Sequence, residues 1–398
     1  MDINKFCKNY NKDTFLKLPL KTQRFFLRIS KIILDNWNNN LEKCRRSKNC
    51  IVDNHGFVGL AYIIKNILEP SIPKKEPEYI SGIMSMNIFT SKKHKIKVMF
   101  LEDMHSMEFN CKTKEKNILP VTKFIENQIA TSTDFVDLFL EVPYISRKKG
   151  EIKSIGHSYM ADVHEDLSNC FEWSKKMCEY PNLRSHYVDL RTPDMDYDFF
   201  KFQDEIIEYY FTGNVINKSS NTKLWTNYRN NTKLAKILKT KVSFQKHIKK
   251  IILKSKIQKQ IDNIEDVGIK KIIEKKIETW LNNPTDTNID WKYMTWDYIM
   301  KALETGNKKQ IGNIYYSLAS YSGILMDAYT IARMFRKYSK KPNVYSGVAK
   351  NIIIFAGGQH TQRYIDVLKQ IGMDAVFETA RTEDNCVNIK KIKKTYIS

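Results

Sequence analysis

Short apolar runs bounded by polar or turn-forming residues recur along the chain and predict β-strands. Five of these runs are rich in β-branched or aromatic residues and have the length of buried strands. They are KIKVMFLE (95–102), DFVDLFLEV (134–142), SHYVDL (185–190), NIIIFAG (351–357) and DAVFE (374–378).

Helical patterns lie between these strands. Pro120 precedes VTKFIENQIA and suits the first turn of a helix, and residues 159–178 have a second helical pattern. After the strand at 351–357, an amphipathic stretch begins near Gln359 or His360 and ends at Gly372. Alternating strands and helices predict an α/β fold with a mostly parallel sheet flanked by helices.

Two long regions depart from this alternation. Residues 1 to about 90 have apolar residues mainly at helical spacing, and residues 233–281 form a Lys-rich helical pattern without a strand signal. The length also favours more than one packed unit. We therefore expect an N-terminal helical region (1–90), a first half of the α/β core (91–210), a basic helical insertion (211–310) and a second half of the core (311–398).

The charge is strongly basic. The 398 residues include 66 Lys and Arg against 44 Asp and Glu, a net charge of +22, and the pI is near 9.4. This balance suits a polyanionic partner such as nucleic acid, contacted through residues 233–281. The alternative is a solvated helix face in a chain whose Lys, Asn and Ile content reflects codon usage. Aromatic residues in this segment are few, chiefly Phe244, so we expect contact with phosphate and not with bases.

The cysteines and the N-terminus bear on the compartment. Seven cysteines form no CxxC pair, and the polar N-terminus MDINKFCKNYNKD does not resemble a secretory signal. We therefore expect free thiols and an intracellular protein that is not secreted. No window approaches the roughly 18 apolar residues of a membrane span.

Polar residues capable of chemistry stand where the predicted strands end. Glu102 ends the first strand and His105 follows it, Glu141 ends the second, and Arg191 follows the third. His360 follows the fourth. Because the carboxyl ends of parallel strands share the edge at which ligands bind, we expect these side chains to converge if the strands are neighbours. They could act as general acids and bases, or His105, Glu141 and His360 could bind a divalent transition metal.

His360 can be placed more finely. A helix that begins beside it puts His360 on the inward stripe one turn before Tyr364. Gly357 and Gly358 permit a positive φ and a tight turn beneath a ligand, and the helix N-terminus favours an anion. The alternative is a core histidine hydrogen-bonded to a carbonyl. Asp327 lies on the apolar stripe of the helix at 321–338 and must have a partner, either a site histidine or a basic side chain.

These strand-end motifs resemble those of the TraB/Tiki/ChaN/erythromycin-esterase superfamily. The matching residues are Glu102 and His105 in FLEDMH, Glu141 in LFLEV, and Gly357 and His360 in FAGGQH. The chain also resembles proteins of large DNA viruses that have a helix like LMDAYTIARMF before an (I/V)xxAGxxH strand. The resemblance implies a split α/β core with helical insertions, a location in the host cytoplasm or the virion, and ester hydrolysis, metal-dependent peptide cleavage or haem binding.

Two hypotheses follow for the function. The first is a hydrolase acting on an ester or a peptide. Glu102 stands where the Tiki-type motif has glycine, which favours an esterase-like use of Glu102 and His105. The second is a non-catalytic scaffold or packaging protein that binds a polyanion. No P-loop, GxGxxG, GxSxG or HExxH motif is present, which argues against nucleotide binding through those motifs, a serine hydrolase and a zincin.

Overall fold

The structure is a computed structural model. It describes residues 78–103, 111, 117–132, 134–143, 159–170, 178, 180, 182–191, 196–212, 226, 228–282, 291–338 and 347–390. The predicted helices within residues 1–77 and the candidate site residue His105 lie outside the described residues.

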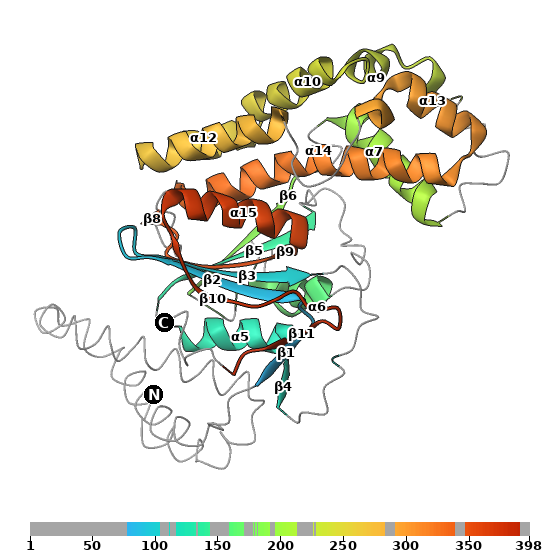
Figure 1. The fold of residues 1–398 in the computed structure, drawn as a ribbon. Helices are drawn as coiled ribbons and strands as arrows, with labels where there is room; N and C mark the ends of the chain where they lie inside the picture. Colours follow the sequence, from blue (N-terminus) through green and yellow to red (C-terminus); the bar gives the residue numbers. More distant parts are fainter. Residues whose placement is uncertain are drawn as a thin grey trace, which may run out of the picture.

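A six-stranded sheet forms the centre of the molecule (Figure 1). Strands β3, β9, β5 and β6 are mutually parallel. Strand β2 pairs with β3 in antiparallel fashion, and β10 pairs with β2 in the same way. The predicted α/β class with a mostly parallel sheet is therefore confirmed. The order is β10 (Asp374–Glu378), β2 (Ser85–Ser91), β3 (Ile96–Asp103), β9 (Asn351–Gly357), β5 (Val136–Pro143) and β6 (Leu183–Asp189).

Residues 79–81 and 85–91 form strands, whereas the sequence predicted a mainly helical region to about residue 90. Strand β2 has the sequence SMNIFTS, in which apolar and polar residues do not alternate regularly. The pattern therefore does not predict a half-buried strand. The strand is nevertheless almost wholly buried because β10 and β3 pair with it on both sides. Two smaller sheets complete the strands. One has the order β11 (Cys386–Asn388), β1 (Tyr79–Ser81) and β4 (Ile118–Pro120), and the other pairs β7 (Lys337–Tyr338) with β8 (Gly347–Val348).

Helices cover both faces of the central sheet (Figure 1). On one face, α5 (Val121–Thr131) and α6 (Tyr159–Asp166) with the short η3 (Ser168–Cys170) share a core with Met99, Leu138 and Ile353. On the other face, α14 (Lys308–Phe335) and α15 (Gly358–Ile371) pack against the alternate residues, such as Phe100 and Ile354. Because successive strand residues point to opposite faces, both faces are apolar and the strands read as continuous hydrophobic runs.

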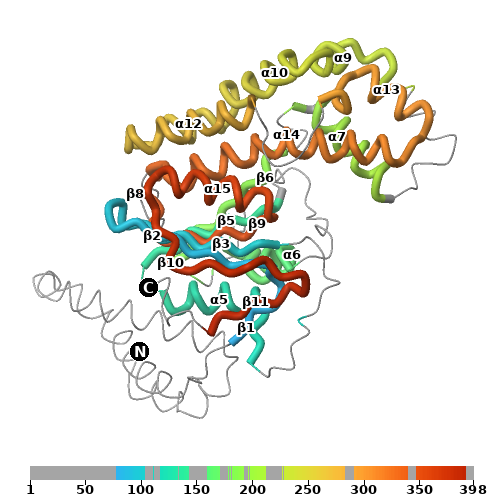
Figure 2. Tube along the Cα trace, viewed as in Figure 1, coloured from blue at the N-terminus to red at the C-terminus, as the bar shows by residue number. Residues whose placement is uncertain are grey.

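A second helical layer lies over α14 on the side away from α5 (Figures 1 and 2). The predicted single Lys-rich run is divided there by side-chain caps, including a capping box at Thr240 and a cap at Ser255. Isoleucines such as Ile248 and Ile273 are buried, and the lysines face outward. The helices are α7 (Tyr197–Thr212), α9 (Thr232–Ile237), α10 (Lys241–Lys254), α11 (Lys256–Asp262), α12 (Val267–Asn282), η4 (Trp291–Met294) and α13 (Trp296–Thr305).

Two cysteine pairs contradict the expected free thiols. Cys111 is disulfide-bonded to Cys386, and Cys170 is bonded to Cys178. The first pair joins residues 275 positions apart, so only the fold brings it together, and local spacing gave no signal for it. In the part of the chain that the structure describes, no helix is long and apolar enough to span a membrane.

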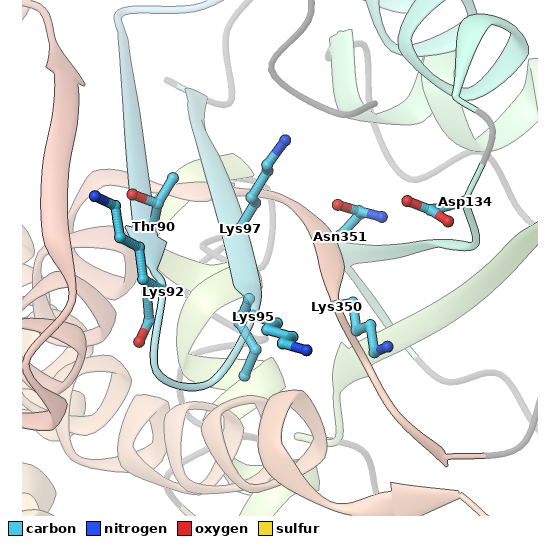
Figure 3. A pocket seen from close by; sticks show the side chains of 9 residues that line it. Thr90, Lys92, Lys95, Lys97, Asp134, Lys350 and Asn351 are labelled. Atoms are coloured by element: carbon cyan, nitrogen blue, oxygen red, sulfur yellow. The ribbon is translucent and has the colours of Figure 1, made fainter.

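The two edges of the sheet differ in their side chains. The carboxyl ends of β3, β9, β5 and β6 carry the acidic and imidazole groups described below. At the opposite edge, a pocket of about 460 Å³ lies among the amino ends of β3 and β9, the end of β2 and Asp134 (Figure 3).

Candidate functional site

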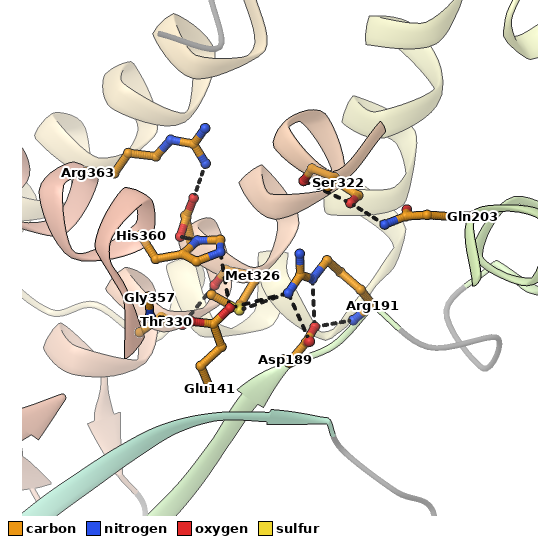
Figure 4. A network of polar contacts seen from close by, with 12 residues as sticks. Glu141, Asp189, Arg191, Gln203, Ser322, Met326, Thr330, Gly357, His360 and Arg363 are labelled. Carbon is orange, nitrogen blue, oxygen red and sulfur yellow. Dashed lines mark hydrogen bonds and ion pairs between the residues drawn. The ribbon is translucent and has the colours of Figure 1, made fainter. Parts of the chain in front are cut away.

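The four parallel strands bring Glu102, Glu141, Arg191 and His360 to one edge of the sheet. Strand β9 lies between β3 and β5, and β6 follows β5, so the carboxyl ends are neighbours as the sequence hypothesis required. Glu141 on β5 and Glu102 on β3 lie on either side of the end of β9, where α15 begins. Figure 4 shows Glu141, Arg191 and His360 pointing toward one another at this edge.

His360 lies in the first turn of α15 and contacts two carboxylates. Its Nδ1 is 2.6 Å from Oδ1 of Asp327, and its Nε2 is 3.2 Å from Oε1 of Glu141. The His360 side chain is 13% exposed, so the ring is mostly but not wholly buried. The predicted helix start and the inward orientation of His360 are both confirmed. The alternative, a core histidine bonded to a backbone carbonyl, is wrong, because both ring nitrogens contact carboxylates.

These contacts keep the imidazole charged. Burial alone lowers the pKa of His360, but the negative charges of Asp327 and Glu141 outweigh it and raise the pKa to about 9. An imidazolium can donate from both ring nitrogens at once, whereas a neutral ring has only one donor. His360 is therefore a proton donor at neutral pH.

Asp327 is the partner that the sequence predicted on the apolar stripe of α14. It is fully buried, and it accepts hydrogen bonds from His360 Nδ1 and from Arg363 Nη1 on α15. Burial raises the pKa of this carboxyl, but the charges and hydrogen bonds of His360 and Arg363 lower it by more. The net pKa is below the ordinary value, so Asp327 is ionised. Its role is to hold the His360 ring with Nε2 directed toward Glu141.

Glu141 is held by the backbone and by Arg191. The N–H of Gly357 donates to Glu141 Oε2 at 2.6 Å, and Arg191 Nη2 lies 3.5 Å from Oε1. Arg191 also forms a two-pronged ion pair with Asp189, at 2.8 and 3.0 Å. Although burial by itself lowers the pKa of Arg191, Asp189 and Glu141 raise it, so the guanidinium stays charged. The result is a positive group placed beside the Glu141–His360 pair.

Glu102 faces the start of α15 from the other side. Ser85 Oγ donates to its Oε2 at 2.7 Å, and Arg381 Nε lies 2.6 Å from its Oε1. A Cβ atom on Gly358 would stand 2.1 Å from Glu102 Oε1, closer than any real contact. Gly358 is therefore required for the close approach of a carboxylate.

The predicted use of the glycines for a positive φ is wrong. Gly357 has a φ of −65°, and among the described glycines the positive values belong to Gly82, Gly306, Gly347 and Gly372. The strand continues directly into the helix, so no left-handed turn is needed. Gly357 and Gly358 serve the chain's own carboxylates, Glu141 and Glu102.

Two of the three predicted metal ligands lie together at this edge. These are Glu141 and His360, whereas the third, His105, lies outside the described residues. Within the described ranges, no group of three or more His, Cys, Asp or Glu side chains is placed to hold a metal ion. Both ring nitrogens of His360 contact carboxylates, and Arg191 puts a further cation beside Glu141. The described donors thus fit a proton and not a metal, and metal binding stays a prediction that depends on His105.

Several contributing residues were not predicted. Arg363 lies one helical turn after His360, so the spacing held a signal for it. Gly323 lies in the middle of α14, and a Cβ there would stand 3.1 Å from His360 Cε1. A glycine inside a helix lowers helix stability by about 1 kcal/mol relative to alanine. A glycine at such a position therefore indicates that a side chain from another element packs closely against the helix. Arg381 lies in a segment after β10 and had no local signal.

A second buried ion network lies at the other end of β5. Asp137, four residues before Glu141 on the same face of the strand, contacts His186 Nε2 at 2.7 Å and forms an ion pair with Arg184. Burial and the charge of Arg333 lower the pKa of His186 to about 3, so this ring is neutral and its Nδ1 accepts from Arg333 Nη2 at 2.7 Å. His186 is thus neutral, whereas His360 at the carboxyl edge is positively charged.

Comparisons with known protein families, with curated proteins and with solved structures found no match for this chain.

Proposed function

We propose that the carboxyl edge of the sheet is an acid–base site that hydrolyses an ester or a peptide bond. The observation that carries the proposal is the pairing of a carboxylate and an imidazolium, Glu141 and His360, with 3.2 Å between Oε1 and Nε2. Such a pair can accept one proton and donate another in the same reaction. The position agrees with the general location of ligand sites in open α/β sheets.

The reaction uses the two groups in opposite senses. Glu141 accepts a proton from water as the water oxygen attacks the substrate carbonyl carbon. His360 then donates its Nε2 proton to the leaving oxygen or nitrogen as the bond to the carbonyl carbon breaks. The products are a carboxylic acid and an alcohol or amine. Glu141 returns its proton to His360, and their direct contact gives the path for this transfer.

The neighbouring groups support these roles. Asp327 holds Nδ1 of His360 and favours its charged form, as a carboxylate behind a catalytic imidazole does. Arg191, whose side chain is 17% exposed, stabilises the negative charge that develops on the carbonyl oxygen. Glu102, with Ser85 and Arg381, is proposed to bind the substrate on the other side of β9.

Panels of p-nitrophenyl esters and fluorogenic peptides test this function. Glu141→Gln and His360→Gln should each lower turnover by about 100-fold or more, since each removes one proton-transfer group. His247→Gln is the matched control, because His247 has a similar exposure of 14% and pairs with Asp196 on the helical layer. Its turnover should equal that of the wild type. Absence of hydrolysis by the wild-type protein, or full turnover in His360→Gln, would end the proposal.

A second candidate is a scaffold or packaging protein that binds nucleic acid or another polyanion. It is favoured by the lysines of α10: Lys249, Lys250 and Lys254 are exposed and pair with no carboxylate among the described residues. Phe244 is fully buried, so nucleic-acid bases cannot stack on it, and the contact would be with phosphate. Binding to single-stranded DNA should then fall steeply with salt, and a flat dependence would reject this candidate. The resemblance to large DNA virus proteins proposes the host cytoplasm or the virion as the location for either function.

A further inference from the structure

The pocket at the amino edge of the sheet is lined by an excess of positive charge. Four lysines from three segments surround it, together with a single acidic side chain, Asp134 (Figure 3). The lysines are Lys92 and Lys95 between β2 and β3, Lys97 on β3 and Lys350 before β9. Lys97 and Asn351 are register partners on adjacent strands, so the sheet itself fixes their side chains next to each other.

Three of these lysines lack an acidic partner. Lys92, Lys95 and Lys350 are exposed, and no carboxylate of the described residues lies within ion-pair distance of them. Like charges held together repel one another, and a bound anion relieves that repulsion. Asp134 offsets only part of the charge. Its side chain is also exposed, and its backbone, not its carboxylate, makes the hydrogen bonds with Ser132.

The backbone of Lys95 adds an independent observation. Its φ is +53°, in the left-handed region that residues other than glycine rarely occupy. Within the β2–β3 connection, glycine would adopt this conformation without a steric cost. A lysine is present instead, and its side chain lines the pocket. An unfavourable backbone conformation combined with a charged side chain at a pocket is typical of a binding position.

We propose that this pocket binds a small ligand carrying several linked phosphate groups. Lysine ammonium groups are compact charges that bind phosphate oxygens, and Asn351 and Thr90 add polar groups at the same place. The volume of about 460 Å³ suits a small molecule. None of the nine lining residues is aromatic, so no stacking surface exists there for a base. The phosphate chain is therefore the recognised group.

The phosphate pocket is separate from the proposed hydrolytic site. Asn351 lines the pocket at the first residue of β9, and Gly357 contacts Glu141 at the last. Seven strand residues separate the two edges by about 20 Å. Phosphate binding at this pocket is independent of hydrolysis at the carboxyl edge, so either function can be absent while the other is present.

Titration calorimetry with sodium triphosphate tests the proposal. The wild-type protein should bind one triphosphate, and the double variant Lys95→Gln/Lys350→Gln should bind at least about tenfold more weakly. Lys308→Gln/Lys309→Gln at the start of α14 has the same net charge and is the matched control, which should bind as the wild type does. No binding by the wild type, or equal weakening in both double variants, would overturn the proposal.

Two further variants separate charge from folding. Asp134→Asn should tighten triphosphate binding severalfold because it removes the opposing charge, and a damaged fold cannot produce this gain. Lys95→Gly should weaken binding while the melting temperature stays equal or rises, since glycine suits the positive φ. Unchanged affinity in both variants would reject the pocket. If a single-stranded DNA oligomer, and not triphosphate, loses its binding in Lys95→Gln/Lys350→Gln, the pocket belongs to a polymer and the proposal is wrong.

Discussion

The proton held by His360 between Asp327 and Glu141 couples folding stability to pH. In the unfolded chain this histidine has an ordinary pKa of 6.5, and in the folded protein the two carboxylates raise the pKa to about 9. The folded state therefore binds the proton more tightly. The stabilisation is fully present below pH 6.5 and is lost as the pH rises through 9.

The raised pKa of His360 sets the magnitude of this stabilisation. Each tenfold change in proton affinity corresponds to about 1.4 kcal/mol, so a pKa raised from 6.5 to about 9 contributes about 3 kcal/mol to the free energy of unfolding. The side chain is only 13% exposed, so solvent screens little of this energy. The lowered pKa of Asp327 belongs to the same ion pair and is not an additional contribution.

The assay is urea denaturation of the wild-type protein and His360→Gln between pH 6.5 and 9.5. Other groups also titrate near this window, and the comparison with the variant removes their effect. Burial and the charge of Asp189 raise the pKa of Asp204 to about 6, and the pKa of His186 is near 3; both groups are present in the two proteins alike, so their contributions cancel in the difference. The stability advantage of the wild type over the variant should shrink by about 3 kcal/mol across the window.

Parallel stability curves would refute the reasoning. If the difference between wild type and His360→Gln is the same at pH 6.5 and pH 9.5, the folded and unfolded states hold this proton equally. His247→Gln again serves as the control, because its ion pair with Asp196 lies away from the site. Its difference from the wild type should not reproduce the loss seen with His360→Gln.

Three further predictions concern packing and buried charge. Gly358→Ala should destabilise the protein by about 1–3 kcal/mol because its Cβ overlaps Glu102, and the same substitution in a Glu102→Ala background should cost clearly less by denaturation. Asp137→Ala should cost about 3–5 kcal/mol, since it leaves buried positive charge unpaired; Glu265→Ala, in an exposed ion pair, should cost less than about 1 kcal/mol in the same measurement. Ile354→Ala, at the fully buried centre of β9, should cost about 2–5 kcal/mol, and a melting curve close to that of the wild type would show that β9 is not the centre of the core.

The fold was most predictable where local pattern and tertiary environment agree. Strand β9 and helix α15 were located almost to the residue, because an uninterrupted apolar run is followed at once by an amphipathic one. Strand β2 was missed because SMNIFTS has no local signal and is buried only by its neighbours. The Lys-rich run was correctly helical, but the breaks at Thr240 and Ser255 depend on caps that periodicity does not report.

The candidate site was predictable as a set of strand ends and not as a charge network. Glu141 and His360 were selected because they stand where predicted strands end, and Asp327 because it is a carboxylate on an apolar helix stripe. Their contacts depend on the strand order, which places β9 between β3 and β5 and could not be derived from one sequence. The charged state of His360 depends on two carboxylates from different elements, so it follows only from the assembled structure.

Nitrogen-15 NMR of the histidine rings tests the central claim most directly. In the wild-type protein, with assignment by comparison to His360→Gln, the His360 ring should show two protonated nitrogens at pH 7. It should lose a proton only near pH 9. A neutral His360 ring at pH 7, with a midpoint at or below 6.5, would contradict the acid–base pair proposed for this site.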